Sequence, residues 1–265
     1  MYETTYHRAS DVDDAVAKLG SADDGKYLAG GMTLLPTMKQ RLAAPTALVD
    51  LTHIADLKAV SVEGKSVRIG AMVTHYEISQ NSAIKSVCPA FPMLAGWIGD
   101  PAVRYRGTIG GSIANNDPAA DYPAALLALD ATIHTNQREI KADEFFTGLF
   151  ETALEDSEIV TAVSFTAPDA CGYEKFRNPA SRYAMAGVFV AKTGGTVRVG
   201  VTGAGSDGAF RWSDAESALG SNFTAAALDS LSLNEGDMLS DIHATSAYRA
   251  NLVKVMAKRA VAAAG

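Results

Sequence analysis

Residues 104–123 read RYRGTIGGSIANNDPAADYP, and residues 27–36 read YLAGGMTLLP. Each stretch contains two adjacent glycines between apolar and hydroxyl-bearing residues, and the pair Gly30-Gly31 lies between an expected strand and an expected helix. Glycines in such turns permit positive φ and a close approach of the main chain to a ligand, and the exposed N–H groups favour an anion such as a pyrophosphate. Two such turns far apart in the chain indicate an extended ligand held at both ends, and a dinucleotide fits that description.

A tight turn without a ligand is the alternative for either stretch taken alone, since neither has the G-x-G-x-x-G spacing of a Rossmann site. A phosphate-binding P-loop is a second possibility, because Gly20–Lys26 (GSADDGK) matches its first seven positions. However, Tyr27 stands where a Mg²⁺-binding hydroxyl is required, and two aspartates in the loop would repel phosphate. We interpret this segment as a surface turn.

Two acidic residues follow the second glycine pair. Asp117 can cap a helix that Pro118 begins, which is a purely structural role. Asp121 falls inside that expected helix, where capping does not explain it. Because carboxylates beside nucleotide sites accept hydrogen bonds from ribose hydroxyls, Asp121 is the better candidate for a ligand contact.

The composition is that of an ordinary globular protein, with 265 residues, 48% hydrophobic and 20% charged, and a net charge of −7. The negative charge argues against a nucleic-acid partner. The two cysteines, Cys88 and Cys171, are too few for a disulfide framework or a metal site, and we expect both to be buried apolar residues. We find no secretory signal and no apolar run long enough to cross a bilayer, so we expect a cytoplasmic protein without a transmembrane segment.

Helix and strand patterns are mixed along the whole chain, and the sequence pattern changes near residue 170. We expect a mixed α/β part before that point and a smaller α+β part after it, with 167–172 (APDACG) as the best linker candidate. The expected elements include helices over 33–42, 124–129 and 245–263, hairpins over 58–69 and 184–202, and strands near 131–135 and 158–165.

Three segments make the sequence recognisable: AGGMTLLP (29–36), GDPAVRYRGTIGGSIANNDPAADYPAA (99–125) and KFRNPASRYAMAGVFVA (175–191). Together they resemble the FAD-binding medium subunit of the molybdenum hydroxylases, a group that includes aerobic carbon monoxide dehydrogenase and the flavin portion of xanthine dehydrogenase. The resemblance spans almost the whole chain in the expected order. It implies an α+β (mixed α/β) fold, with an FAD-binding domain of the vanillyl-alcohol-oxidase (PCMH) type and a small C-terminal α+β domain of the CO dehydrogenase flavoprotein type.

The resemblance also implies boundaries and contacts. The FAD-binding domain would cover 1–170, in subdomains of about 1–55 and 56–170, and the C-terminal domain 171–265. Both glycine turns would embrace the FAD pyrophosphate, Asp121 would bind the adenosine side, and an arginine and a tyrosine would lie nearer the flavin. The implied cofactor contacts are Ala29, Gly30, Gly31, Met32, Thr33, Leu34, Ile98, Thr108, Gly110, Gly111, Ser112, Asp121, Ile159, Val160, Arg177 and Tyr183.

Position 32 departs from the pattern of the resemblance, in which His, Gln or Asn is frequent. A histidine there would suggest the covalent flavin link of related oxidases, but Met32 cannot form that bond. We therefore expect FAD to be bound non-covalently.

Function follows from the resemblance and from what the chain lacks. The chain shows no catalytic constellation and no metal-ligand set, and two cysteines cannot hold an iron–sulfur cluster, which needs four thiolates. The implied role is an electron-transfer subunit that receives electrons from [2Fe–2S] clusters and passes them to an acceptor such as NAD or a quinone. Its partners would be a large molybdopterin subunit and a small [2Fe–2S] subunit, in a dimer of heterotrimers that forms an oxidoreductase.

Two alternatives remain open from the sequence. One is a stand-alone FAD oxidoreductase of the same fold, which would need its own substrate pocket over the flavin. The other is a non-enzymatic binding module in which the glycine turns are only structural. Flavin absorbance of the purified chain separates the module from both enzymes, and co-purifying subunits separate the two enzymes.

Overall fold

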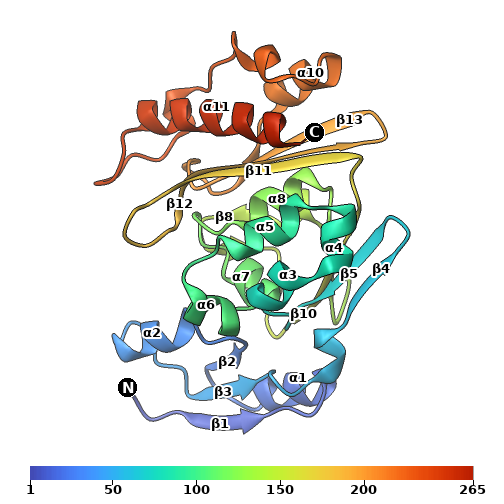
Figure 1. The fold of residues 1–265 in the computed structure, drawn as a ribbon. Helices are drawn as coiled ribbons and strands as arrows, with labels where there is room; N and C mark the ends of the chain where they lie inside the picture. The colour runs from blue at the N-terminus through green and yellow to red at the C-terminus, as the bar shows by residue number, and fades with distance from the viewer. Residues whose placement is uncertain (265) are drawn as a thin grey trace.

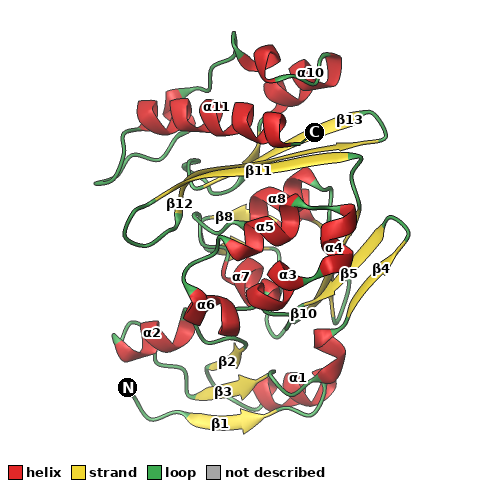
Figure 2. Ribbon diagram, in the orientation of Figure 1, coloured by secondary structure: helices red, strands yellow, loops and turns green. Residues whose placement is uncertain are grey.

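Three sheets follow one another along residues 1–264, the part of the chain that the computed structural model describes (Figures 1 and 2). The first is a parallel sheet of order β1-β3-β2, in which Ala47 of the central strand pairs with Thr5 on one side and Gly25 on the other. Helix α1 begins after Asp11, whose side chain accepts from Asp14 N, and buries Ala15 in the small core beside this sheet. The elements are β1 (Thr5–Arg8), α1 (Val12–Gly20), β2 (Gly25–Leu28), α2 (Leu34–Lys39) and β3 (Ala47–Asp50).

The second sheet is antiparallel, of order β4-β5-β10-β6-β7, and packs with a group of short helices. Strand β10 lies at its centre because Val163 and Phe165 are apolar on the buried face. A two-stranded ribbon, β8 with β9, lies between β7 and β10 in the chain. The elements are β4 (Val60–Glu63), β5 (Ser66–Gly70), α3 (His75–Gln80), α4 (Ser82–Val87), α5 (Ala90–Gly96), α6 (Pro101–Arg106), α7 (Ile109–Asn115), α8 (Tyr122–Ala128), β6 (Thr132–Thr135), β7 (Glu139–Lys141), α9 (Ala142–Phe145), β8 (Phe146–Gly148), β9 (Glu151–Thr152) and β10 (Val160–Thr166).

The third sheet, of order β11-β12-β13-β14, is antiparallel and lies between the central helices and the C-terminal helix α11 (Figure 1). Strand β12 is an apolar run because both of its faces are covered: Phe189 and Ala191 join the central core, whereas Val188 and Val190 pack with α11. The elements are β11 (Ala170–Arg177), β12 (Ala184–Thr193), β13 (Thr196–Thr202), β14 (Phe210–Arg211), α10 (Ser213–Ser221) and α11 (Ser246–Ala263).

Most of the expected elements are present, and two expectations need correction. The helix expected over 33–42 ends at Lys39, and Thr33 precedes it without making a side-chain cap. The linker expected over 167–172 is wrong, because β11 begins at Ala170 and buries Cys171. The change from the second to the third sheet therefore occupies only residues 167–169.

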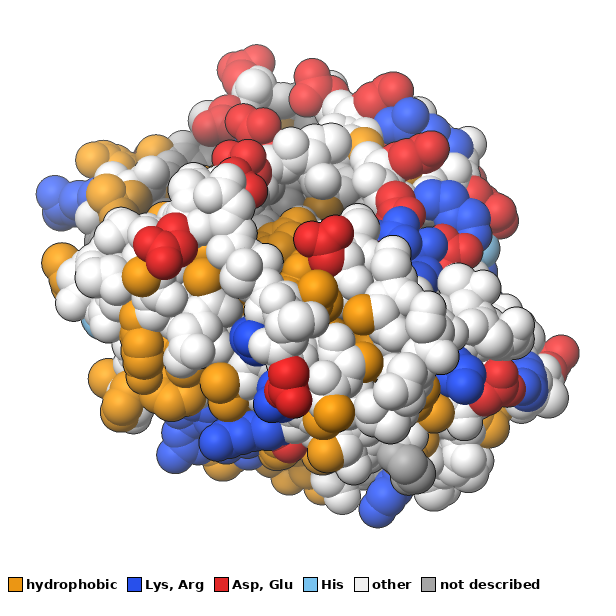
Figure 3. Space-filling view, turned by 90° about the horizontal axis from the view of Figure 1, so that it is seen from above, with side chains coloured by type: hydrophobic (Ala, Val, Ile, Leu, Met, Phe, Trp, Pro, Cys, Tyr) orange, Lys and Arg blue, Asp and Glu red, His pale blue; other side chains and the backbone are white. Residues whose placement is uncertain are grey.

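The two cysteines are both buried, as expected, and Cys88 Sγ lies 3.6 Å from Cys171 Sγ across the boundary between the central helices and β11. None of the helices in the described part of the chain is long and apolar enough to span a membrane. On the face shown in Figure 3, acidic and basic side chains lie next to one another along the right-hand side.

Candidate functional site

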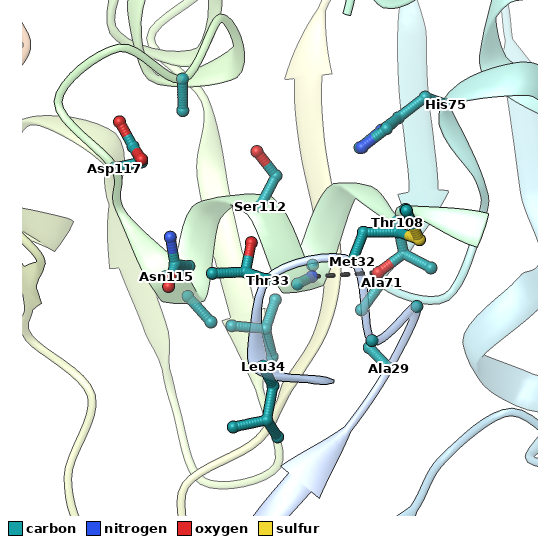
Figure 4. A pocket seen from close by; sticks show the side chains of 18 of the residues that line it. Ala29, Met32, Thr33, Leu34, Ala71, His75, Thr108, Ser112, Asn115 and Asp117 are labelled. Atoms are coloured by element: carbon teal, nitrogen blue, oxygen red, sulfur yellow. Dashed lines mark hydrogen bonds between the residues drawn. The ribbon is translucent and has the colours of Figure 1, made fainter. Parts of the chain in front are cut away.

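A cavity of about 520 Å³ opens where the three parts of the chain meet. The first part contributes the loop after β2, the central part contributes residues around α6 and α7, and the loop between β11 and β12 contributes Ser181 and Tyr183. In Figure 4 the side chains of Thr33, Ser112 and His75 point into one space. This volume is within the range of pockets for small molecules and cofactors.

The two glycine turns lie against each other at this cavity. A Cβ built on Gly30 would lie 2.1 Å from the carbonyl oxygen of Arg106 and 2.8 Å from Cα of Gly107. On the other side, a Cβ on Gly111 would lie 3.4 Å from the Cβ of Ala29. Only a residue without a side chain permits the contact at Gly30, so this glycine is required by the close approach of two main chains.

The first turn presents a row of free main-chain donors. Within residues 1–264, the N–H groups of residues 30–34 have no hydrogen-bond partner, and the first amide to be used is that of Leu35, which donates to Gly31 O. Gly31 has φ +71°, which turns the chain sharply at this point. The hydroxyl of Thr33 also has no partner among these residues, because it makes no cap. These five consecutive residues all line the cavity, and a run of main-chain donors without partners is suited to an anion.

The second turn differs from the sequence expectation. We expected further free N–H groups, but those of Gly110, Gly111 and Ser112 donate to Ala71 O, Thr108 Oγ1 and Thr108 O. Thr108 accepts two of these bonds as it caps α7, and Ala71 accepts the third. The second turn therefore contributes a close main-chain surface and the Ser112 hydroxyl, which has no partner in the described chain, rather than a second row of amides.

Asp121 lines the cavity, but its carboxylate already accepts hydrogen bonds from side chains of strand β11. Lys175 Nζ donates to its two carboxylate oxygens at 2.8 and 2.9 Å and to Trp97 O at 3.2 Å, and the Tyr173 hydroxyl donates to Oδ1. Burial raises the pKa of Asp121, and the neighbouring Lys175 opposes this rise. Asp121 lies at the start of α8 rather than inside a helix, and makes no capping bond.

Lys175 and Tyr173 were missed from the sequence, although Lys175 begins one of the segments that carry the resemblance. The available signal was a lysine in a strand that is otherwise largely buried. A buried ammonium ion needs a paired carboxylate, and that requirement alone would have linked Lys175 to an acidic residue elsewhere in the chain.

All but one of the predicted contact residues lie at this cavity. The exception is Arg177, whose guanidinium carbon lies 4.3 Å from the centre of the Trp97 ring, outside the lining. The predicted residues that line the cavity are Ala29, Gly30, Gly31, Met32, Thr33, Leu34, Ile98, Thr108, Gly110, Gly111, Ser112, Asp121, Ile159, Val160 and Tyr183.

His75 lines the same cavity and was not predicted. Its side chain is buried, with 4% of the residue exposed, and Nδ1 lies 3.2 Å from the Tyr122 hydroxyl. Burial lowers the pKa of His75 to about 3, and the positive charge of Arg104 adds to this effect. The imidazole is therefore neutral at physiological pH.

The low pKa of His75 predicts acid sensitivity of the protein without bound cofactor. The unfolded chain takes up a proton near pH 6.5 and the folded chain only near pH 3, so stability is lost as the pH falls through this window. Between pH 7 and pH 5 we expect the free energy of unfolding to fall by about 2 kcal/mol more than in His75→Gln. Urea unfolding of both proteins at the two pH values measures this difference; equal falls would contradict it.

The described residues hold no cluster of three or more His, Cys, Asp or Glu side chains able to bind a metal ion. Each carboxylate at the cavity also has a partner within the protein. Glu158 pairs with Arg138, Asp121 with Lys175, and Asp117 accepts from Ala119 N. The site thus combines an anion-binding turn with hydroxyls and apolar walls.

Comparisons with known proteins identify the family of this chain. Residues 2–168 match the family of FAD-binding domains in molybdopterin dehydrogenase. The chain is 33% identical over 273 residues to the nicotine 6-hydroxylase medium subunit of Paenarthrobacter nicotinovorans, covering 98% of this chain and 96% of that protein. It is 34% identical over 275 residues to the carbon monoxide dehydrogenase medium chain of Hydrogenophaga pseudoflava, with the same coverage.

Solved structures give the same result for the fold. A chain of the Cu,Mo-CO dehydrogenase superposes with a TM-score of 0.89 at 34% identity, covering 99% of this chain and 97% of that one. A chain of quinoline 2-oxidoreductase from Pseudomonas putida superposes with a TM-score of 0.87 at 26% identity, covering 98% and 96%. The α+β fold, the family match and the near-complete coverage place this chain in one group: it belongs to the FAD-binding subunits of the molybdenum hydroxylases, which are oxidoreductases.

Proposed function

We propose that this chain binds FAD in the cavity between its three sheets, with the diphosphate on the free N–H groups of residues 30–34. That row of unpartnered donors is the observation that carries the proposal, because it offers several hydrogen bonds to one anionic group and no protein group within residues 1–264 takes them up. Because Gly30 contacts the second turn, the main chains of both turns lie close to the proposed position of the diphosphate.

The remaining lining fits the other parts of the cofactor. Ile98, Ile159 and Val160 offer apolar surface of the kind that a flat ring system requires, and Tyr183 is a half-exposed aromatic residue at the cavity. Tyr173 and Lys175 use three of the four lone pairs of the Asp121 carboxylate, which leaves one on Oδ2 for a ribose hydroxyl. Arg177 is not included in this proposed set. We also propose that the FAD-binding domain covers residues 1–170, with subdomains of about 1–55 and 56–170, and that the C-terminal domain covers 171–265.

The proposed activity is electron transfer within a larger complex. Bound FAD supplies the capacity to accept electrons singly from [2Fe–2S] clusters and to deliver them to an external acceptor such as NAD or a quinone. This chain's residues bind and orient the cofactor, and none is assigned an acid–base role. Each carboxylate at the cavity already has a hydrogen-bond or ion-pair partner within the protein, which supports that assignment.

The proposed partners are a large molybdopterin-binding subunit and a small [2Fe–2S] subunit, in a dimer of heterotrimers in the cytoplasm. Affinity purification of the tagged chain from its source cells should recover two further chains together with molybdenum, iron and FAD. Recovery of the chain alone, with FAD and turnover of a small substrate, would instead support a stand-alone oxidoreductase.

Non-covalent attachment gives a direct prediction. Met32 lines the cavity at the position where a histidine would be needed for a covalent link. Precipitation of the FAD-loaded protein with trichloroacetic acid should leave the yellow colour in the supernatant and a colourless pellet. A yellow pellet that survives washing in denaturant would show a covalent bond and contradict the proposal.

A further inference from the structure

His75 presents to the cavity a ring nitrogen that no group in residues 1–264 satisfies. Nδ1 faces Tyr122, whereas Nε2 has no hydrogen-bond partner in residues 1–264. In that part of the chain, Arg249 Nε is the one fully buried side-chain nitrogen or oxygen without a partner, so His75 Nε2 reaches the cavity surface. Figure 4 shows the imidazole directed into the space that Ser112 and Thr33 also face.

The contact with Tyr122 determines which nitrogen carries the proton. The Tyr122 hydroxyl is completely buried, and His75 Nδ1 is its one partner in the described chain. If Nδ1 accepts from this hydroxyl, the phenol proton is satisfied and the neutral ring must carry its own proton on Nε2. The other tautomer would leave a buried O–H donor without an acceptor, which costs about 1–3 kcal/mol. His75 is therefore an Nε2–H donor aimed into the cavity.

Gly107, in the neighbouring turn, leaves room for this donor because it has no side chain. A Cβ on Gly107 would lie 2.6 Å from His75 Nε2, yet Gly107 has φ −62°, which any residue can adopt. The glycine is thus needed for the imidazole edge rather than for backbone conformation. Gly107 also touches Gly30, so a single residue separates the imidazole from the row of free amides in the first turn.

We propose that His75 Nε2–H donates a hydrogen bond to a diphosphate oxygen of the bound dinucleotide, and that Tyr122 is the positioning residue that fixes its tautomer. This inference rests on the proposed binding of FAD. Its basis is the convergence of an unpartnered donor and five free amides on one cavity, which is the pattern expected around a group that has several anionic oxygens.

The test compares FAD dissociation constants, measured by flavin fluorescence on protein stripped of flavin. His75→Leu removes the donor and should weaken binding about 10- to 100-fold, the usual effect of losing a hydrogen bond to a charged group. His75→Gln keeps an N–H donor at similar reach and should bind within about 3-fold of wild type. His134→Gln is the matched control, because His134 lies on β6 and does not line the cavity, and it should bind as wild type.

Two spectroscopic readouts separate this role from a structural one. Histidine ¹⁵N spectra of the flavin-free protein should show His75 as the neutral Nε2–H tautomer, and Tyr122→Phe should shift it toward a mixture and weaken FAD binding less than His75→Leu does. The ³¹P resonances of bound FAD should move in His75→Leu and stay near their wild-type positions in His75→Gln. Thermal unfolding of each variant identifies any that fail to fold.

The outcomes are distinct. If wild-type protein takes up no FAD, the proposed function fails and this inference with it. If wild type binds FAD and folded His75→Leu binds equally tightly, this inference alone is wrong. Weaker binding with unchanged ³¹P resonances would also overturn it, because the acceptor would then lie elsewhere on the cofactor.

Discussion

Gly30→Val should purify without flavin and bind added FAD at least about 100-fold more weakly than wild type, a loss of about 3 kcal/mol. The reason is that a side chain at position 30 meets main chain, with the Arg106 carbonyl oxygen 2.1 Å from the first added carbon. No rotamer change relieves this clash, because the atoms that the Cβ meets are main-chain atoms of Arg106 and Gly107. The two turns must separate, and the row of free amides then loses its place beside the second turn.

The ratio of flavin to protein absorbance after purification, followed by titration with FAD, measures this effect. Gly20→Val is the matched control, since a Cβ there has no atom within 4 Å and the residue lies at the end of α1, away from the cavity. Full flavin content in Gly30→Val would show that the contact between the turns is not needed for binding.

Lys175→Met should lower the free energy of unfolding by about 3–5 kcal/mol, the second large effect that we expect. Both members of the Lys175–Asp121 pair are almost completely buried, so removing the ammonium ion leaves a carboxylate in an apolar setting. Burial already raises the pKa of Asp121, and without Lys175 this pKa should rise further. Urea unfolding measures the loss.

A double variant and a change of pH test the cause of this loss. Asp121→Asn combined with Lys175→Met removes both charges and should recover most of the stability. The penalty in Lys175→Met should be smaller at pH 5 than at pH 8, because the folded protein can then protonate Asp121, whereas the unfolded chain keeps it ionised. A penalty that is equal at both pH values and is not rescued would assign the loss to packing.

The elements and glycine turns could be predicted because their signals are local. Gly194-Gly195 between two apolar runs gave the hairpin of β12 and β13, and the break between apolar residues and Gly30 gave the end of β2. Most of the proposed contact residues followed from the resemblance, since they occupy the motifs themselves. These features depend on neighbours in the sequence or on motifs shared with a known family, and neither requires knowledge of how the chain packs.

The unpredicted part of the site consists of pairs that are distant in sequence. Lys175 pairs with Asp121 from 54 positions away, and His75 meets Tyr122 from 47 positions away. Periodicity along one element carries no information about such contacts. The second turn shows a related limit, because Thr108 and Ala71 use its amides in a way that its glycine spacing does not reveal.

The three-sided construction of the cavity has a consequence for biosynthesis. Its walls include Ser181 and Tyr183, and Asp121 at its edge is held by Lys175 on a strand that packs against α11 near the end of the chain. A ribosome that has released only the first two sheets therefore presents an incomplete pocket. We therefore expect flavin loading to follow the emergence of the C-terminal sheet, so that a finished polypeptide rather than a nascent one acquires the cofactor.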